Sequence, residues 1–427
     1  MFRQQVMNTK QKNSEAQESP LQLGGSGKHL LFIDEDLIMG GIATLITRVS
    51  RLLVNDGWRV TLLVKTIDSE VKQMLPEKLE VIEMSTSFHW MYFPEYAISR
   101  SKTLGLNTVD IIFATGIVAN WLGSILSALL STHPKLLSGV YTASEFCYPR
   151  SMSVLNFGDH LRTAQFDKNV PDSSKLFMSE TIRQYHVKSF GRTMCDAHIC
   201  VLPIDEAMFT NRNRHPNRFK IVSVGRLCKS KTYNLYMLEV VRHLRDKGYP
   251  VCWEVYGTGE MEHEMRRRIM DANLDACVRL HGNLAYQSFN EALADAGAFV
   301  GMGTAIIEAS FCRVASVVAV VSSETEKTYG YVYNLPFGAC GERLATTPSL
   351  STTELLERLF LISEAEYGVE MERTWQYVQP YGQQRVYETL LRCFQSARPC
   401  KGSYWRFVAY NLHGLLRKVF RRSALPS

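Results

Sequence analysis

The chain has 427 residues, 46% of them apolar and 21% charged, a composition that indicates a soluble globular protein of two or three domains. The formal net charge is +6, but residues 389–427 hold eight Lys or Arg and no acid, so the positive charge is that of a tail and excludes a nucleic-acid-binding body. Ten scattered cysteines, the closest pair being Cys195 and Cys200, exclude a zinc knuckle or a CxxC redox pair and favour reduced thiols in the cytoplasm.

The first 28 residues are rich in Gln, Asn, Ser and Lys, and they contain no apolar stretch of the kind that a secretory signal needs. A segment with so few apolar residues cannot bury enough surface to offset the entropy of ordering it. We therefore expect 1–28 to be a disordered tail.

From residue 29 onward, short apolar runs alternate with amphipathic stretches, which predicts a parallel sheet covered by helices on both faces. Gly40 and Gly41 mark the first turn, and the apolar residues that follow recur at helical spacing. We expect 29–202 to form one Rossmann-like domain. Strands are predicted at 29–34, 58–64, 79–84, 109–114, 135–142, 175–179 and 197–202, and helices at 42–56, 117–130 and 180–192.

The uncharged run 111–130 is long enough to span a bilayer. However, Thr115 and Gly116 interrupt it after a β-branched start, and Asn120, Ser124 and Ser127 would lie in hydrocarbon. A buried strand followed by a buried helix accounts for the interruption, and a membrane span does not.

Residues 203–218 are polar, contain two prolines and are predicted to be a linker. The α/β pattern then begins again, which predicts a second Rossmann-like domain over 219–368. Two such domains would face each other across a cleft, and ligands of such sheets bind at the carboxyl ends of the strands. Strands are predicted at 219–224, 251–256, 277–282, 298–302 and 314–320, and helices near 233–247, 260–272, 286–296 and 304–312.

The first strand of the second domain leads into a loop that carries Arg226 and Lys231. Two fixed cations beside a cleft suit a pyrophosphate, both in binding and as charge develops on a leaving group. The alternative is a pair of solvated loop charges. Gly257 and Gly259 form half of a dinucleotide fingerprint, a pattern that is more often an ordinary strand-to-helix turn.

The segment VGMGTAIIEAS, residues 300–310, offers a second phosphate site. Gly303 would let the backbone approach a ligand, Thr304 is expected to cap the next helix, and that helix start offers free N–H groups to a phosphate. Glu308 lies one turn further along the same face, where a carboxylate can accept hydrogen bonds from a ribose diol. The alternative is a surface glutamate, which the apolar neighbours of Glu308 disfavour.

These residues carry a resemblance. Six motifs of the second domain resemble, in the same order, those of the donor domain of retaining glycosyltransferases of family 4. They are VGRL with a lysine five residues after the arginine, the GTG turn, HGNL at 281–284, GTAIIEA, VVAV at 317–320 and the segment 326–342. The family has the GT-B architecture, two Rossmann-like domains facing across a cleft. The resemblance is specific for the second domain and weaker for the first.

The resemblance implies a nucleoside-diphosphate-sugar donor, with Arg226 and Lys231 on the diphosphate and Glu308 on the ribose. It also implies that Gly40 and Gly41 form the loop that closes over the donor phosphates, where the alternative is a plain turn. The nucleotide sugar is a substrate, so no cofactor is expected. Residues 29–202 would be the acceptor side, 219–368 the nucleotide-sugar side, and 369–400 a helix crossing back.

Two positions depart from the family pattern. The family has a pair of glutamates of which Glu308 would be the second, and Val300 stands in place of the first. Thr142 stands where many relatives have a histidine near the donor sugar. Glu145 is a candidate replacement facing the sugar, and a surface glutamate is the alternative.

Asp34-Glu35-Asp36 has the Asp-x-Asp form with which metal-dependent transferases of another fold hold a divalent cation. It follows the first strand of the chain, and Arg226 and Lys231 offer the diphosphate metal-free charge. We therefore expect helix capping or solvation here, and no metal site.

The leading hypothesis is an enzyme that moves a sugar from a nucleotide sugar to a saccharide or lipid-linked saccharide with retention of configuration, as in surface polysaccharide synthesis. An inactive homologue that binds nucleotide sugars or a partner protein is the alternative, because of Val300 and Thr142. A nicotinamide dehydrogenase is disfavoured, since neither half has a complete GxGxxG with its acidic ribose partner.

Residues 401–427 form a basic amphipathic tail. One helical stripe is apolar and the other side carries arginines and lysines, the form of a helix lying on an anionic membrane surface. The alternative is that the stripe packs back on the first domain. The predicted apolar stripe consists of Trp405, Val408, Leu412, Leu415, Leu416 and Val419.

Overall fold

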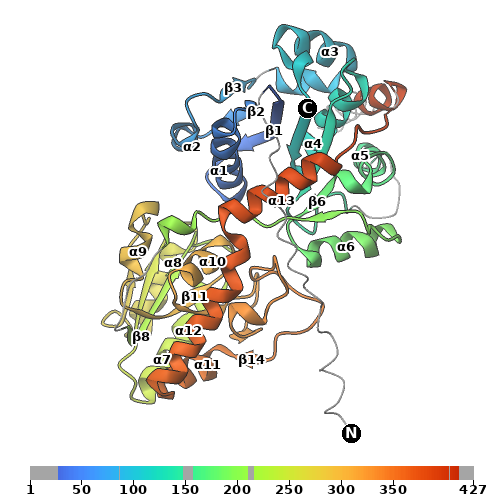
Figure 1. Cartoon of the computed structure of the whole chain (residues 1–427). Coiled ribbons are helices and arrows are strands. Elements are labelled where there is room, and N and C mark those ends of the chain that lie inside the picture. Colours follow the sequence, from blue (N-terminus) through green and yellow to red (C-terminus); the bar gives the residue numbers. More distant parts are fainter. Residues whose placement is uncertain (1–26, 86, 148–156, 210–215, 403, 413–427) are drawn as a thin grey trace, which may run out of the picture.

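A computed structural model describes residues 27–85, 87–147, 157–209, 216–402 and 404–412 (Figure 1). Most of the tail expected to be disordered, residues 1–26, lies outside this part of the chain. The described residues form two α/β units, each built on its own parallel sheet.

The first sheet has seven parallel strands in the order β3-β2-β1-β4-β5-β6-β7. Its central strands are enclosed on both faces, as Leu30 to Ile33 show with no exposed surface. The strands are β1 (His29–Leu37), β2 (Arg59–Ile67), β3 (Glu80–Glu83), β4 (Ile111–Thr115), β5 (Lys135–Val140), β6 (Lys175–Phe177) and β7 (His198–Ile199). The helices are α1 (Gly41–Asn55), α2 (Ser69–Met74), α3 (Pro94–Thr103), α4 (Gly116–Leu129), α5 (Phe157–Asn169) and α6 (Glu180–Phe190).

The apolar run 111–130 is a strand and a helix, as the interruption at Thr115 and Gly116 predicts. β4 ends at Thr115, and Gly116 begins α4 with a φ of 81°, a left-handed value that favours glycine. Asn120 bonds to the carbonyls of Gly116 and Gly139 inside the domain. No helix within the described ranges is long and apolar enough to cross a membrane.

The second sheet has five parallel strands in the order β10-β9-β8-β11-β12. The strands are β8 (Asn217–Val224), β9 (Cys252–Tyr256), β10 (Val278–Leu280), β11 (Ala296–Gly301) and β12 (Ala315–Val318). A separate antiparallel pair consists of β13 (Lys327–Thr328) and β14 (Leu350–Ser351). The helices are α7 (Tyr233–Asp246), α8 (Glu262–Asp271), α9 (Phe289–Ala292), α10 (Thr304–Phe311) and α11 (Thr352–Leu361).

Two predicted helices differ from the observed ones. The helix expected over 286–296 is a 3-10 turn η5 (Tyr286–Ser288) followed by the short α9, because the chain has already joined β11 at Ala296. The single helix expected over 369–400 is two helices, α12 (Glu364–Val378) and α13 (Gln383–Ser396). Pro380 lies in the 3-10 turn between them, and its missing N–H ends α12.

The chain crosses between the two domains twice, and the crossings lie side by side. Ile204 N–H donates to the Tyr381 carbonyl (2.8 Å), and Gln383 N–H donates to the Ile204 carbonyl (2.7 Å). After the second crossing, α13 packs on the first domain, where Phe394 meets the rings of Trp58 and Phe113 (Figure 1). The first domain is therefore completed by a helix from the far end of the chain.

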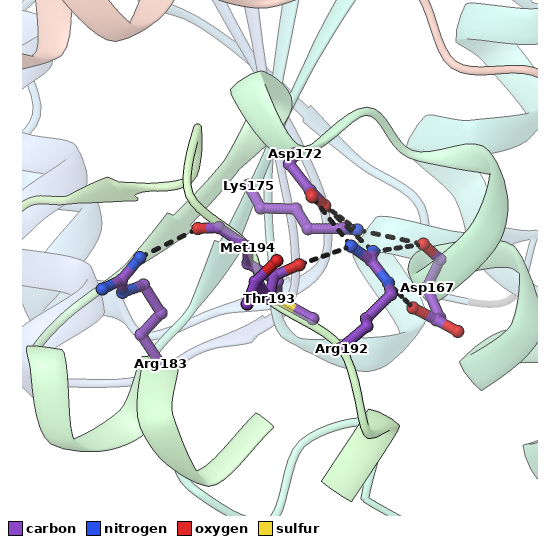
Figure 2. Close-up of polar contacts among 7 residues, drawn as sticks. All are labelled: Asp167, Asp172, Lys175, Arg183, Arg192, Thr193 and Met194. Carbon is purple, nitrogen blue, oxygen red and sulfur yellow. Dashed lines mark hydrogen bonds and ion pairs between the residues drawn. The ribbon is translucent and has the colours of Figure 1, made fainter. Parts of the chain in front are cut away.

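A network of charged side chains ties α5 and β6 to the loop after α6 (Figure 2). The fully buried Lys175 ammonium is paired with Asp172 at 2.8 Å. Arg192 bonds to Asp167 (2.6 Å) and to Asp172 (2.8 Å). Because each buried charge has an opposite partner, the network is a structural tie of the first domain.

The described part of the tail, a helix at 404–412, packs on the first domain. Phe407 is fully buried, Trp121 meets the rings of Phe407 and Tyr410, and the Asn411 amide donates to the Tyr92 carbonyl (2.6 Å). Two residues of the predicted apolar stripe point outward instead, Trp405 at 75% and Leu412 at 56% exposure. The stripe's remaining members, Leu415, Leu416 and Val419, lie outside the described residues.

Candidate active site at the domain interface

A cavity of about 100 Å³ lies where the two domains meet. Leu202, which follows the last strand of the first sheet, forms one wall, and Gly303 and Thr304 at the start of α10 form another. Cys340 and Glu342 also line the cavity. Residues at the carboxyl ends of both sheets therefore meet here, as expected for a ligand site of this architecture.

Arg226 and Lys231 lie in the loop that leaves β8 at this edge. Neither side chain forms a hydrogen bond or an ion pair with a described residue. Lys231 is half-buried, and burial, with the nearby Arg226 charge, lowers its pKa from the ordinary value. A half-buried ammonium with no anionic partner among the described residues is suited to an anionic ligand.

The GTG turn packs against the loop that carries Arg226 and Lys231. Leu227 N–H donates to the Thr258 carbonyl (2.9 Å), and a side chain at Gly257 would collide with the carbonyl of Gly225. Gly257 has a φ of 143°, which also favours glycine. The glycine is thus required for the close approach of two loops, and contact of Gly257 with a substrate stays a prediction.

The N-terminus of α10 has no side-chain cap. β11 pairs with β8, so the loop after Gly301 leaves the sheet beside the loop that carries Arg226. Gly303, with a φ of 74°, is the N-cap residue, and no side chain caps the helix. The prediction that Thr304 caps α10 is therefore wrong: the left-handed turn at Gly303 begins the helix one residue earlier, and Thr304 is its first residue.

Glu308 is buried on α10, with 6% of its surface exposed. Its Oε1 accepts a hydrogen bond from the Tyr286 hydroxyl (3.0 Å), which in turn accepts one from Arg48 of the first domain. Burial raises the pKa of Glu308, and Arg48 and the Tyr286 hydrogen bond oppose that rise. Glu308 is accordingly not a surface glutamate.

The two glycines of the first domain differ in their surroundings. Gly41 faces Leu202, since a Cβ at Gly41 would lie 2.6 Å from the Leu202 Cδ1. Gly40 precedes α1 with a φ of 168°, an extended value open to any residue. The structure therefore places Gly41 against Leu202, a residue of the cavity wall, and explains a glycine there.

Glu145 lies in the turn after β5. Its Oε1 accepts hydrogen bonds from the Thr142 N–H (3.0 Å) and hydroxyl (3.2 Å), whereas its Oε2 is enclosed and has no partner among the described residues. Burial raises the pKa of Glu145 to about 7, and the charge of Asp34 on β1 adds to the rise. Thr142 itself is exposed. Glu145 thus holds the turn and is not a freely solvated surface group.

Comparisons with known proteins find no protein-family model and no curated protein that matches the chain. Solved structures do match over 86% of the chain. HepE from Anabaena, solved with UDP and glucose, is 14% identical and covered over its whole length, with a TM-score of 0.60. A glycosyltransferase from Rickettsia africae is 13% identical and 98% covered, with a TM-score of 0.64. TarM of S. aureus, solved with UDP, fondaparinux and alpha-GlcNAc-glycerol, is 10% identical and 99% covered, with a TM-score of 0.56.

The chain has the GT-B fold. The predicted architecture, two Rossmann-like domains facing across a cleft, is confirmed. At these identities the similarity establishes the fold alone.

Val300 is one of the two departures from the family pattern. Val300 is fully buried in β11 and presents nothing to a ligand. Glu342, which the sequence pattern did not single out, lines the interdomain cavity. Its Oε2 accepts a hydrogen bond from Cys340 N–H (2.6 Å), and burial raises its pKa.

Asp34 and Asp36 of the first GT-B domain have separate protein partners. Asp36 accepts hydrogen bonds from the Thr66 hydroxyl (2.6 Å) and the Lys65 ammonium (3.2 Å), and Asp34 accepts one from the Thr115 hydroxyl. Neither caps a helix, because both lie within β1; the capping expectation is wrong for this reason. Burial raises the pKa of Asp34 to about 6.

Proposed function

We propose that the protein is a glycosyltransferase that uses a nucleoside-diphosphate sugar as donor. The observation that carries the proposal is the half-buried Lys231, which has no anionic partner among the described residues and shares its loop with Arg226. That loop follows β8, and the uncapped start of α10 follows the neighbouring strand β11. Two cations and a helix N-terminus at one edge of a sheet favour a diphosphate. The same charges would stabilise the nucleoside diphosphate as it leaves the sugar.

The remaining site residues are assigned around that diphosphate. Glu308 would bind the ribose, and Gly257, Gly303 and Thr304 would lie on the nucleotide side. Gly40, Gly41, Thr142 and Glu145 would lie toward the sugar and acceptor. The resemblance to family 4 supports transfer with retention and without a metal, and UDP in the HepE and TarM structures makes a UDP-sugar the first donor to test.

We propose a saccharide or lipid-linked saccharide as acceptor, in polysaccharide synthesis on the cytoplasmic side of a membrane. The outward Trp405 and Leu412 of the tail support peripheral contact with an anionic lipid surface, since exposed aromatic and apolar side chains favour the interface. The basic residues 417, 418, 421 and 422, which would add electrostatic attraction, lie outside the described part of the chain.

One observation favours a second candidate function. Val300 offers no carboxylate, so the chain would be a nucleotide-sugar-binding protein without turnover if that carboxylate were essential. The same pocket would then bind donor and transfer nothing.

A panel of nucleotide sugars, screened by thermal shift and then by turnover with saccharide acceptors, tests both. A true donor at a hundred times its Kd should stabilise the fold by about 2.7 kcal/mol. Release of nucleoside diphosphate that persists in EDTA supports the metal-independent transferase. Stabilisation without turnover supports the binding protein, and no stabilisation by any nucleotide sugar would contradict both.

A further inference from the structure

Arg48 of α1 is a buried cation at the domain interface. It is 7% exposed and forms no ion pair with a described carboxylate. Its guanidinium donates to the Pro203 carbonyl, where the chain first crosses between the domains, and to the Tyr286 hydroxyl of the second domain. A buried arginine is costly unless its charge is balanced, so an anion that acts on Arg48 matters.

That anion is reached through Tyr286. The Tyr286 hydroxyl has one hydrogen, which it donates to Glu308 Oε1 (3.0 Å), and its lone pair accepts from Arg48. Phe209 holds the tyrosine ring edge-on, with centroids 5.4 Å apart. A directed chain of hydrogen bonds therefore runs from α1 of the first domain, through η5, to α10 of the second.

We propose that Arg48 is a positioning residue for the nucleotide site: acting through Tyr286, it holds the Glu308 carboxylate in place for the ribose of the donor. The inference rests on the proposed function, because it gives Glu308 its ribose. It adds a residue from the opposite domain to the donor site. Arg48 itself touches neither the substrate nor the reacting atoms.

The geometry leaves room for this role. The chain of hydrogen bonds occupies Oε1 of Glu308, and Oε2 makes no hydrogen bond with a described residue and is not fully enclosed. One oxygen is thus fixed and the other is available. Fixing the carboxylate in advance removes the entropy cost of ordering it when the nucleotide binds.

The charge of Glu308 depends on the same contacts. Among the described residues, Arg48 and Tyr286 are the ionisable groups that act on it, and both lower a pKa that burial raises. An ionised carboxylate is the stronger hydrogen-bond acceptor. Without Arg48 the pKa of Glu308 should rise further, so that less of it is ionised at neutral pH and a more alkaline solution is needed to restore its charge.

The test compares UDP with 2′,3′-dideoxy-UDP, which lacks the ribose diol. Calorimetric Kd values are measured between pH 6 and 9 for the wild type, Arg48→Met, Tyr286→Phe and Glu308→Ala. The wild type should prefer UDP by about tenfold or more, the effect of a hydrogen bond to a charged group. Ionisation of the diphosphate is common to both nucleotides and cancels in the ratio.

Both Arg48→Met and Tyr286→Phe should lose most of that preference at pH 7, and Arg48→Met should regain it as the pH rises. Tyr286→Phe keeps the ring against Phe209, so it reports the hydroxyl alone. Arg51→Met is the matched control: Arg51 is on the same helix but exposed, and the preference should be unchanged.

If Glu308→Ala removes the preference but Arg48→Met and Tyr286→Phe retain it at every pH, the positioning role is wrong while the proposed function stands. If the wild type binds neither UDP nor another nucleoside diphosphate, the proposed function fails, and the role of Arg48 fails with it. If the wild type binds UDP without any preference for the diol, the assignment of Glu308 to the ribose is wrong, and so is the inference.

Discussion

At the scale of single residues, the candidate site is defined by charges that have no partner among the residues the structure describes. Lys231 and Arg226 are of this kind, whereas Asp36, which the Asp-x-Asp pattern also made a candidate, is paired with Lys65. The sequence predicted the two cations because their spacing follows a strand. It could not distinguish solvated charges from a half-buried ammonium, since burial depends on how the surrounding loops pack.

Replacing either cation separates binding from turnover. Lys231→Ala or Arg226→Ala should lower kcat about a hundredfold, because the charge on the leaving diphosphate is greatest in the transition state. Affinity for the free nucleoside should change little. Steady-state kinetics and calorimetry measure the two effects. Lys229→Ala, an exposed lysine of the same loop, is the control. Wild-type turnover in both cation variants would show that these are solvated charges.

Glu145 should make stability depend on pH. Its folded pKa of about 7 lies above the ordinary glutamate value of 4.5, so the folded state holds the proton more tightly than the unfolded state does. The free energy of unfolding should therefore fall as the pH rises from about 4.5 to 7, and stay lower above that range.

Glu145→Gln should remove this dependence, and its melting temperature should exceed that of the wild type at pH 8 by more than at pH 4.5. Glu70→Gln, at an exposed position of α2, serves as the control. Because Asp34 titrates in the same window, the relevant measurement is the difference between variant and wild type. A constant difference across the pH range would show that Glu145 keeps an ordinary pKa.

The positions of Arg48 and Glu342 at the domain interface could not be predicted from the sequence. Arg48 stands among the apolar positions of α1 and would be solvated on an isolated helix. Only the docking of the second domain buries it against Tyr286. Glu342 follows a loop without strand or helix periodicity, so no pattern indicated that it would face the cavity.

At the scale of elements, apolar runs predicted the strands well because both sheets are enclosed on both faces. Short elements were harder. The stretch 286–296 has helical composition, but β11 must begin at Ala296 to pair with β8, and this pairing leaves only one turn of helix. Tertiary pairing overrode the local preference.

The GTG turn gives a prediction at this scale. Gly257→Ala should lower both the melting temperature and turnover, because the added methyl would collide with the Gly225 carbonyl and displace the loop that carries Arg226. Gly248→Ala is the matched comparison: it has a φ of 91° but open space around it, so it should cost only about 1 kcal/mol of backbone strain and leave turnover unchanged. Equal effects of the two substitutions would mean that the turn does not support the loop.

At the scale of the whole molecule, the repeated α/β pattern predicted the two-domain architecture. It did not predict how α13 and the helix at 404–412 pack on the first domain. The helix at 404–412 has a buried face and an exposed apolar face. One, with Phe407, packs on the first domain, and the other presents Trp405 and Leu412. The sequence predicted a single apolar stripe and could not tell which side the first domain would cover.

The two faces can be tested separately. Phe407→Ala should destabilise the protein by about 3–5 kcal/mol, the cost of removing a buried phenylalanine, as thermal or denaturant unfolding would measure. The double substitution Trp405→Ser with Leu412→Ser should leave the melting temperature unchanged but reduce flotation with anionic vesicles. Neutral vesicles are the control. If the double variant floats as well as the wild type, the exposed face is not a membrane contact.

The return of α13 and the tail to the first domain affects the order in which the protein is assembled. The elements of the second domain, from β8 to α12, are contiguous in the chain, so all of them are present once about residue 378 has left the ribosome. The first domain begins earlier but lacks Phe394 and Phe407, which cover Trp58, Phe113 and Trp121, until the last part of the chain emerges. During synthesis, the domain that is made first should therefore be the last to complete its core.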